Sequence, residues 1–261
     1  MSEQKGTPPQ KGRIVWHDLI TSDPAKAKEF YGQLFGWQIK PVDMGPAGSY
    51  DMIHVGEAGQ GGMIPTPPDQ GIPSHWVAYA NVDDVDEAVK KSDAAGGATR
   101  MPPTDIPGVG RFAVIADPAG AMICPFKHEG SETMPERSWP MPEGSFCWEE
   151  LLTNDVESAK SFYKPIFGWD TQEMDMGPLG TYTTLHRGEA GEGGMMKMPA
   201  EAEAPPHWLP YIAVDDVDAC AARVPGLGGT VYKGPDDIPG VGRFAVFADP
   251  TGATFAIYKS E

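Results

Sequence analysis

Two segments decide the fold of this chain: WHDLITSDPAKAKEFYGQLFGW, from Trp16 to Trp37, and WEELLTNDVESAKSFYKPIFGW, from Trp148 to Trp169. They lie 132 residues apart, and the same offset relates DMGPAGSY to DMGPLGTY, GEAGQGGM to GEAGEGGM, and the two copies of IPGVGRFAV. Over residues 12–127, 55 of 116 positions are identical to their partners without a gap. The sequence is therefore a tandem duplication.

The length of the repeat predicts the domain organisation. A unit of about 115 residues is too long for a solenoid repeat and long enough for a domain with its own core. We predict a first domain over residues 12–128, a linker over 129–143 and a second domain over 144–260. The linker segment is rich in Pro, Glu and Ser, as is typical of an exposed connection.

Local patterns predict the elements inside each repeat. Asp23 is expected to cap a helix that has Pro24 at its first position and ends at Gly36. In the second repeat, Pro165 is expected to shorten or kink the last turn of the equivalent helix. A second cycle follows after HWVAYANV, so each repeat is predicted to be βαβββ twice over. The expected helical stripes of the first repeat are Ala27, Phe30, Tyr31 and Leu34, then Val85, Ala88, Val89 and Ser92.

Composition and charge exclude several classes of protein. The chain has 261 residues, of which 40% are hydrophobic, so it is not a disordered chain. Twenty basic and 37 acidic residues give a net charge of −17, which disfavours nucleic acid and anionic membranes as partners. No apolar run reaches the roughly 18 residues that span a bilayer. The N-terminal residues show no secretory pattern and the three cysteines have no paired spacing, so we expect a cytoplasmic protein.

Taken together, these motifs resemble those of the vicinal oxygen chelate superfamily, the glyoxalase/bleomycin resistance/dioxygenase fold. The landmarks are FY-x-x-[LI]-FGW and DP-x-G, each present twice at a fixed spacing. The resemblance implies an α+β fold of two tandem glyoxalase-like domains. In each, two βαβββ modules would form a curved mixed sheet, backed by helices, around a cup. Members of this superfamily catalyse metal-dependent isomerase, lyase or ring-cleavage reactions, and others only bind a small molecule, so the fold does not fix the function.

The resemblance also implies where a metal would be bound, on the first and last strands of each module. The corresponding positions carry no imidazole or carboxylate, the groups that hard divalent ions require. We therefore expect no metal cofactor, with Zn, Ni, Fe or Mn as the less favoured alternative. On the fourth strand, GGMI and GGMM offer methionines. The positions that can be placed are Trp16, Trp148, Val77, Leu209, Cys124 and Ala256.

Other side chains are candidates for binding or catalysis. Asp18 and Glu150 share a strand face with the tryptophans two residues earlier, whereas His17 should point toward the helix. His75 and His207 are candidates for ligand binding or acid–base chemistry. Arg111 and Arg243 begin strands, where they either hold a ligand carboxylate or pair with Asp105 and Asp237. The residues that could form an aromatic lining of the cups are Trp16, Tyr50, Trp76, Trp148, Tyr182 and Trp208.

The leading hypothesis is a protein that binds a small organic molecule in metal-poor cups, as a monomer or a homodimer, with its reaction unassigned. Its binding residues would be Trp16, Asp18, His75, Arg111, Trp148, Glu150, His207 and Arg243. The alternative is a metal-dependent lyase, isomerase or extradiol-type dioxygenase that uses His75 or His207 with Asp18 or Glu150 as unconventional ligands. A third reading is a structural or protein-binding module without a small ligand.

Overall fold

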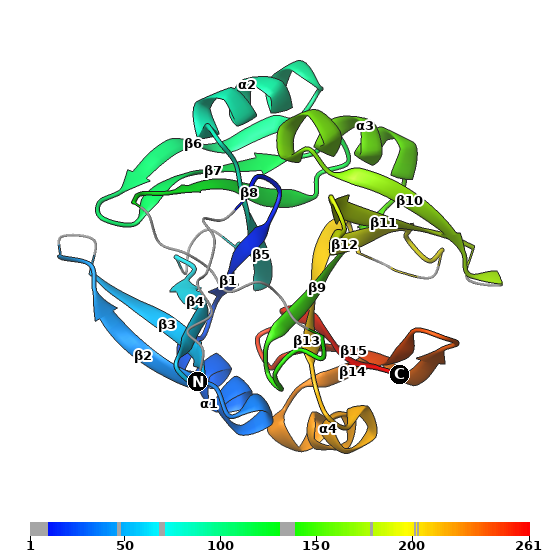
Figure 1. Cartoon of the computed structure of the whole chain (residues 1–261). Coiled ribbons are helices and arrows are strands. Elements are labelled where there is room, and N and C mark those ends of the chain that lie inside the picture. The colour runs from blue at the N-terminus through cyan, green and yellow to red at the C-terminus, as the bar shows by residue number, and fades with distance from the viewer. Residues whose placement is uncertain are drawn as a thin grey trace, which may run out of the picture. The chain divides into compact units, whose positions relative to one another are not determined.

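The computed structural model describes residues 10–45, 48–67, 71–130, 139–177, 180–200, 202 and 204–261. Both repeats contain the same order of strands and α-helices (Figure 1). The first repeat consists of β1 (Ile14–Thr21), α1 (Pro24–Phe35), β2 (Gln38–Asp43), β3 (Ser49–Val55), β4 (Ala58–Pro65), β5 (His75–Asn81), α2 (Val85–Ala94), β6 (Ala98–Ile106), β7 (Gly110–Ala116) and β8 (Met122–His128).

The second repeat differs from the first by a short 3₁₀ helix, η3. It consists of β9 (Phe146–Thr153), α3 (Val156–Phe167), β10 (Asp170–Asp175), β11 (Thr181–Arg187), β12 (Ala190–Lys197), β13 (His207–Ala213), α4 (Val217–Arg223), η3 (Pro225–Leu227), β14 (Thr230–Ile238), β15 (Gly242–Ala248) and β16 (Thr254–Ser260). Among the described residues, no helix is both long enough and apolar enough to cross a membrane.

Each repeat contributes one eight-stranded mixed sheet, and the two sheets have the same strand order. The first runs β2-β3-β4-β1-β5-β8-β7-β6, and the second runs β10-β11-β12-β9-β13-β16-β15-β14. In the first sheet, β1 pairs with β4 and β5 pairs with β8 in parallel, whereas the hairpin strands pair antiparallel. The α+β fold with two βαβββ modules in each repeat is confirmed.

The helix signals in the sequence are confirmed at α1. The carboxylate of Asp23 accepts from the backbone N–H of Lys26 at 3.1 Å, so it satisfies one of the free donors of the first turn. Gly36 ends the helix in the left-handed region at φ 70°, which glycine adopts without a steric penalty. The buried face is the expected one: Ala27, Phe30, Tyr31 and Leu34.

Helix α3 corrects the expectation of a shortened last turn. It contains Pro165 yet spans 12 residues, as many as α1, and ends at the equivalent glycine, Gly168. Proline removes only one backbone donor, and the apolar face of the last turn remains buried through Ile166 and Phe167. Packing of this face therefore outweighs the loss of one hydrogen bond.

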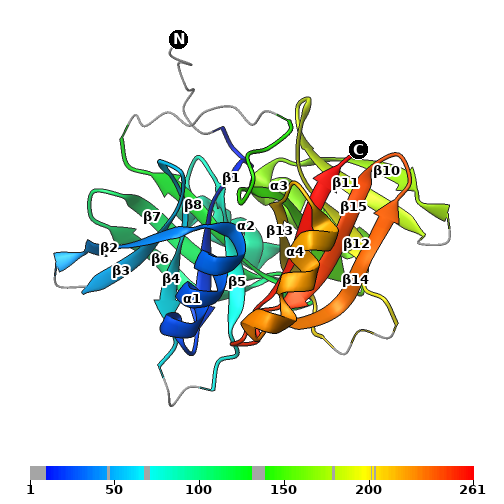
Figure 2. The ribbon, with the colours of Figure 1, turned by 90° about the horizontal axis from the view of Figure 1, so that it is seen from below.

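The contacts of the chain define two compact units, and each unit contains one module from each repeat. Of the described residues, those within 1–15, 78–137 and 148–208 form the first unit, and those within 16–77, 138–147 and 209–261 form the second. In the first unit α2 lies beside α3, and in the second α1 lies beside α4 (Figures 1 and 2). The domain boundaries at 12–128 and 144–260 stay a prediction. Residues 131–138 of the expected linker lie outside the described residues.

Candidate functional site

The alternation of side chains along β1 separates two faces. Leu19 is fully buried in the same hydrophobic cluster as the α1 residues Phe30 and Tyr31. The His17 ring is also buried and stacks on Phe146, with ring centroids 3.9 Å apart. Because neighbouring strand residues alternate, Trp16 and Asp18 lie on the opposite, helix-free face. The expected orientation of these residues is confirmed.

Trp16, Asp18, Tyr50 and Gly62 form what we call the Trp16 cluster, in the second unit. The indole nitrogen of Trp16 donates to the Tyr50 hydroxyl at 2.8 Å and to a carboxylate oxygen of Asp18 at 3.2 Å. The Tyr50 hydroxyl donates to the same carboxylate oxygen at 2.5 Å. Asp18 is only 4% exposed, whereas Trp16 and Tyr50 are half-buried. Two aromatic rings and one buried carboxylate are therefore held together by hydrogen bonds.

The protonation of Tyr50 is fixed by its surroundings. Burial raises the pKa of Tyr50 far above its usual range, and the negative charge of Asp18 raises it further. The phenol therefore stays protonated at physiological pH and remains a donor to Asp18. Its oxygen accepts from Trp16 at the same time, so the two aromatic side chains are oriented with respect to each other.

Gly62 provides the space that Tyr50 occupies. It lies on β4 in register with Asp18, and a Cβ atom added to it would come 1.9 Å from the Tyr50 hydroxyl oxygen. Gly61, next to it, allows β4 to approach β1 closely, because its Cβ would meet the carbonyl oxygen of His17 at 2.3 Å. The repeated motif GEAG-x-GGM therefore has a steric reason.

The second repeat builds the same arrangement in the first unit, from Trp148, Glu150, Tyr182 and Gly194, which we call the Trp148 cluster. The indole nitrogen of Trp148 donates to the Tyr182 hydroxyl at 2.8 Å. A Cβ on Gly194 would lie 2.2 Å from that hydroxyl oxygen. Glu150 is in register with Gly194 and 6% exposed. The tryptophan, the tyrosine, the glycine and an acidic residue thus recur in both repeats.

His75 and His207 are similar to each other. The Nδ1 atom of each lies 2.8 Å from a proline carbonyl oxygen two residues earlier, Pro73 or Pro205. Since a carbonyl only accepts, Nδ1 carries a hydrogen in both rings, and in the neutral imidazole the lone pair lies on Nε2. Burial lowers the pKa of His207, although its hydrogen bond to Pro205 opposes the shift. This histidine is therefore held in its neutral form near neutral pH.

Arg111 and Arg243 are held by carboxylates. Arg111 donates two hydrogen bonds to Asp86, at 2.8 and 3.0 Å, and one to Asp105 at 2.7 Å. Arg243 makes the equivalent bonds to Asp218 and Asp237. The guanidinium groups lower the pKa of Asp86 and of Asp218. The expected ion pairs to Asp105 and Asp237 are present, and a ligand-binding role for the two arginines stays a prediction.

The expected aromatic lining needs one correction. The indole of Trp76 donates to Tyr31 at 3.0 Å, and that of Trp208 donates to Tyr163 at 3.1 Å. Both tryptophans belong to the hydrophobic clusters beneath the helices, because they alternate with His75 and His207 along their strands. Sequence reasoning also missed the glycines under the tyrosines. Their occurrence in both repeats was the available signal.

The metal positions implied by the resemblance do not fit a hard divalent ion. Val77, Leu209, Cys124 and Ala256 are buried and carry no imidazole or carboxylate. The methionines of the fourth strands, Met63 and Met195, are buried in the clusters beneath the helices. Within the described ranges, no three His, Cys, Asp or Glu side chains come close enough together to hold a metal ion.

Comparison with known proteins agrees with the fold. The model of the glyoxalase/bleomycin resistance protein/dioxygenase superfamily matches residues 13–124 and 148–257. CFP32 of Mycobacterium tuberculosis, named as a glyoxylase, is 39% identical over 257 residues, covering 96% of this chain and 95% of the relative. The anthracycline biosynthesis protein DnrV of Streptomyces peucetius is 34% identical over 262 residues, covering 95% of this chain and 93% of the relative.

Solved structures with the same fold include two enzymes. The Mn(II)-bound glyoxalase of Novosphingobium aromaticivorans matches with a TM-score of 0.65 at 16% identity, covering 95% of this chain and 82% of that one. The 2,2',3-trihydroxybiphenyl 1,2-dioxygenase of Sphingomonas wittichii also has a TM-score of 0.65, at 13% identity, covering 95% of this chain and 90% of that one. At these identities the similarity concerns the fold alone.

Proposed function

We propose a ligand-binding function for this chain, which belongs to the glyoxalase/bleomycin resistance protein/dioxygenase superfamily. Each repeat binds a planar, hydroxylated organic molecule on its helix-free face. The observation that carries this proposal is the Trp16 cluster, which recurs as the Trp148 cluster. The reaction that follows binding, if there is one, is unassigned.

The chemistry of the Trp16 cluster favours this class of ligand. The half-buried rings of Trp16 and Tyr50 offer flat apolar surface on which an aromatic ring can stack. The carboxylate of Asp18 offers an acceptor beside them, which suits a ligand hydroxyl. A ligand with a ring plane and a hydroxyl would use both features, whereas an aliphatic diol would use only the second.

The name of one relative points in the same direction. DnrV is named for anthracycline biosynthesis, and anthracyclines are polycyclic aromatic compounds that carry hydroxyl groups. The relative is 34% identical over nearly the whole chain. This likeness supports a polycyclic hydroxylated aromatic as the ligand class of the present chain.

The proposal is tested by calorimetric titration with 1,2-dihydroxyanthraquinone, and with trans-1,2-cyclohexanediol as the non-aromatic control. We expect saturable binding of the quinone at two sites per chain and no binding of the diol. Trp16→Ala should remove one of the two sites, and Asp18→Asn should weaken that site about tenfold. His17→Gln, whose side chain lies on the other face, should change neither. Binding that is insensitive to Trp16→Ala and to Trp148→Ala would reject the proposal.

A metal-dependent lyase, isomerase or dioxygenase reaction is the second candidate function. It is favoured by the free Nε2 lone pairs of His75 and His207, since a carbonyl at Nδ1 is the usual partner of a metal-binding histidine. Metal analysis after dialysis against chelator separates the two candidates. We expect less than a tenth of an equivalent of Zn, Ni, Fe or Mn per chain. One retained equivalent per repeat would establish the second candidate.

We also propose a reducing compartment such as the cytoplasm, with the protein as a monomer or homodimer. All three cysteines, Cys124, Cys147 and Cys220, are buried and form no disulfide, as is usual in a reducing compartment. The net charge of −17 argues against nucleic acid and anionic membranes as partners. Sedimentation velocity at two salt concentrations would give the oligomeric state.

A further inference from the structure

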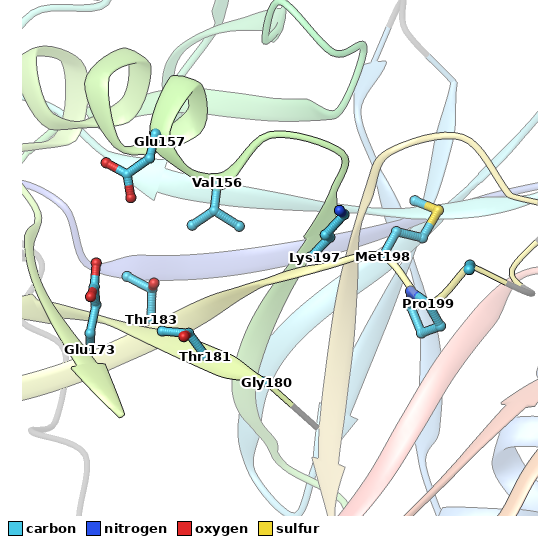
Figure 3. A pocket seen from close by; sticks show the side chains of 10 residues that line it. Val156, Glu157, Glu173, Gly180, Thr181, Thr183, Lys197, Met198 and Pro199 are labelled. Atoms are coloured by element: carbon cyan, nitrogen blue, oxygen red, sulfur yellow. The ribbon is translucent and has the colours of Figure 1, made fainter. Parts of the chain in front are cut away.

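A cavity of about 610 Å³ lies in the first unit, at the N-terminus of α3. It is lined by Val156 and Glu157 from the start of the helix, Thr183 from β11 and Lys197 from β12 (Figure 3). Thr183 is in register with Met195, which is buried beneath the helices. The cavity therefore lies on the helix side of β11 and β12, on the opposite face from the Trp148 cluster.

Of the charged residues at this cavity that the structure describes, Lys197 is the one without an ion pair. Glu157 and Glu173 both accept from the ammonium group of Lys160, at 2.7 and 2.8 Å, so the positive charge of Lys160 is shared between these two carboxylates. Lys197 makes no ion pair with any group in the described part of the chain. In Figure 3, Lys197 is drawn on the opposite side of the cavity from the two glutamates. This end of the cavity is suited to a negative group.

Hydrogen-bond donors also line this cavity. Thr183 lines the cavity and is 1% exposed. Its hydroxyl has no hydrogen-bond partner among the described residues. The cap of α3, Asp155, accepts from the backbone N–H of Ser158 and leaves those of Val156 and Glu157 for another acceptor. A hydroxyl without a partner in the protein can donate to a bound molecule, so a ligand acceptor at this place would gain a hydrogen bond.

The first repeat serves as an internal comparison. At the positions 132 residues earlier it has Ala25, Pro41, Asp51 and Pro65 in place of Glu157, Glu173, Thr183 and Lys197. There Asp51 forms an ion pair with Lys28 at 2.7 Å, so its polar group is already satisfied. The donors that line the cavity are therefore specific to the second repeat, while the fold around them is shared.

We infer that this cavity is a second binding site, for a small organic carboxylate, distinct from the sites on the helix-free faces. The ligand's carboxylate meets Lys197 and the N-terminus of α3, whose dipole also favours an anion. Its oxygen accepts from the Thr183 hydroxyl. An aliphatic or aromatic remainder lies against Val156 and Met198, which supply the apolar part of the lining.

The test uses two probes with the same carbon chain and opposite charge, butyrate and butylamine, followed by amide NMR of the full chain. We expect butyrate to shift the amides of Val156, Glu157 and Thr183 to saturation, whereas butylamine leaves them unchanged. The equivalent residues of the first repeat, Ala25 and Asp51, should not respond. Because the repeat supplies the same fold without the donors, this difference reports the site itself.

Two variants and one control sharpen the result. Lys197→Met should lower the affinity for butyrate about tenfold or more, and the isosteric Thr183→Val should lower it several-fold. Lys40→Met removes an exposed lysine from another strand and should change nothing. The inference is overturned if Lys40→Met weakens binding as much as Lys197→Met, if butylamine competes equally, or if the butyrate shifts spread over the surface without saturating.

Discussion

At the scale of single residues, Gly62 decides whether the Trp16 cluster can form. A methyl group at this position would overlap the ring of Tyr50, which cannot move without breaking its bonds to Trp16 and Asp18. We predict that Gly62→Ala lowers the free energy of unfolding by about 1–3 kcal/mol, as for other overpacking substitutions. The same variant should lose binding of 1,2-dihydroxyanthraquinone at one site. Urea denaturation and calorimetry measure the two effects.

Gly234→Ala is the matched control for this substitution. A Cβ at Gly234 would meet nothing within 4 Å, so its effect on stability should be within about 0.5 kcal/mol. If Gly62→Ala lowered the free energy of unfolding no more than Gly234→Ala does, the packing of Tyr50 against Gly62 would not constrain the residue at position 62. The steric account of the repeated glycine motif would then be wrong.

His207 makes stability depend on pH. Its pKa is lowered in the folded chain by burial, so between that value and about 6.5 the unfolded chain binds the additional proton. This contribution to stability is complete above pH 6.5 and is lost as the pH falls through 6.5 toward the folded pKa. We predict that wild-type protein loses more free energy of unfolding between pH 7.5 and 5.5 than His207→Gln does. Equal losses in the two proteins would show that His207 is not the group responsible.

The sequence predicts those parts of the site that depend on the alternation of side chains along one strand. Because strand side chains alternate, Trp16 and Asp18 could be placed on one face and His17 on the other before the structure was known. Tyr50 and Gly62 lie 32 and 44 residues after Asp18 in the sequence. A local period cannot predict contacts over such a separation. Their identity in both repeats was the signal that sequence alone offered.

At the scale of elements, Tyr163 joins three segments of the first unit. Its hydroxyl donates to Asp117 in the turn between β7 and β8 at 3.0 Å and accepts from Trp208 at the start of β13 at 3.1 Å. Burial and the charge of Asp117 raise the pKa of Tyr163 well above its usual range, so the phenol remains a donor. The two family landmarks, FY on α3 and DP-x-G after β7, are thus partners in one hydrogen-bonded link.

Removing this link should be costly. We predict that Tyr163→Phe lowers the free energy of unfolding by about 1–3 kcal/mol, because a buried carboxylate oxygen and a buried indole N–H both lose their partner. Tyr232→Phe, at a tyrosine that is 62% exposed, is the control and should be neutral. Equal stability of the two variants in urea denaturation would mean that the Tyr163 hydroxyl contributes nothing to the packing of α3.

The elements themselves were largely predictable, because caps and apolar stripes are local signals. Asp23 and Gly36 mark the ends of α1 in the sequence as well as in the structure. The effect of Pro165 was not predictable in this way, since the loss of one hydrogen bond competes with the burial of Phe167, and burial depends on residues distant in sequence. Rules based on local sequence fail where the burial of a side chain contributes more to stability than the local hydrogen bond that is lost.

At the scale of the whole molecule, the sequence repeat and the compact unit are different divisions of the chain. In the second unit, the rings of Phe30 and Tyr31 from α1 lie 5.9 and 5.5 Å from Phe255 on β16, which belongs to the other repeat. Ile212 on β13 is fully buried in the same cluster. The repeat was visible in the sequence, whereas the pairing of modules depends on contacts between residues more than 200 positions apart.

This difference predicts how a local loss of stability spreads. Ile212→Val removes one buried methylene at a cost of about 0.5–1.5 kcal/mol. Since cooperative opening follows packed units, hydrogen exchange should accelerate in α1 and β4 of the first repeat and stay at wild-type rates in α3 and β12, which share a repeat with Ile212. Ile115→Val, buried in the core of the first unit, should do the reverse and accelerate α3 but not α1. Hydrogen exchange of the two variants, measured by mass spectrometry, tests this prediction. If exchange accelerated only within the mutated repeat, the repeat would be the cooperative element of this fold, and the compact unit would not.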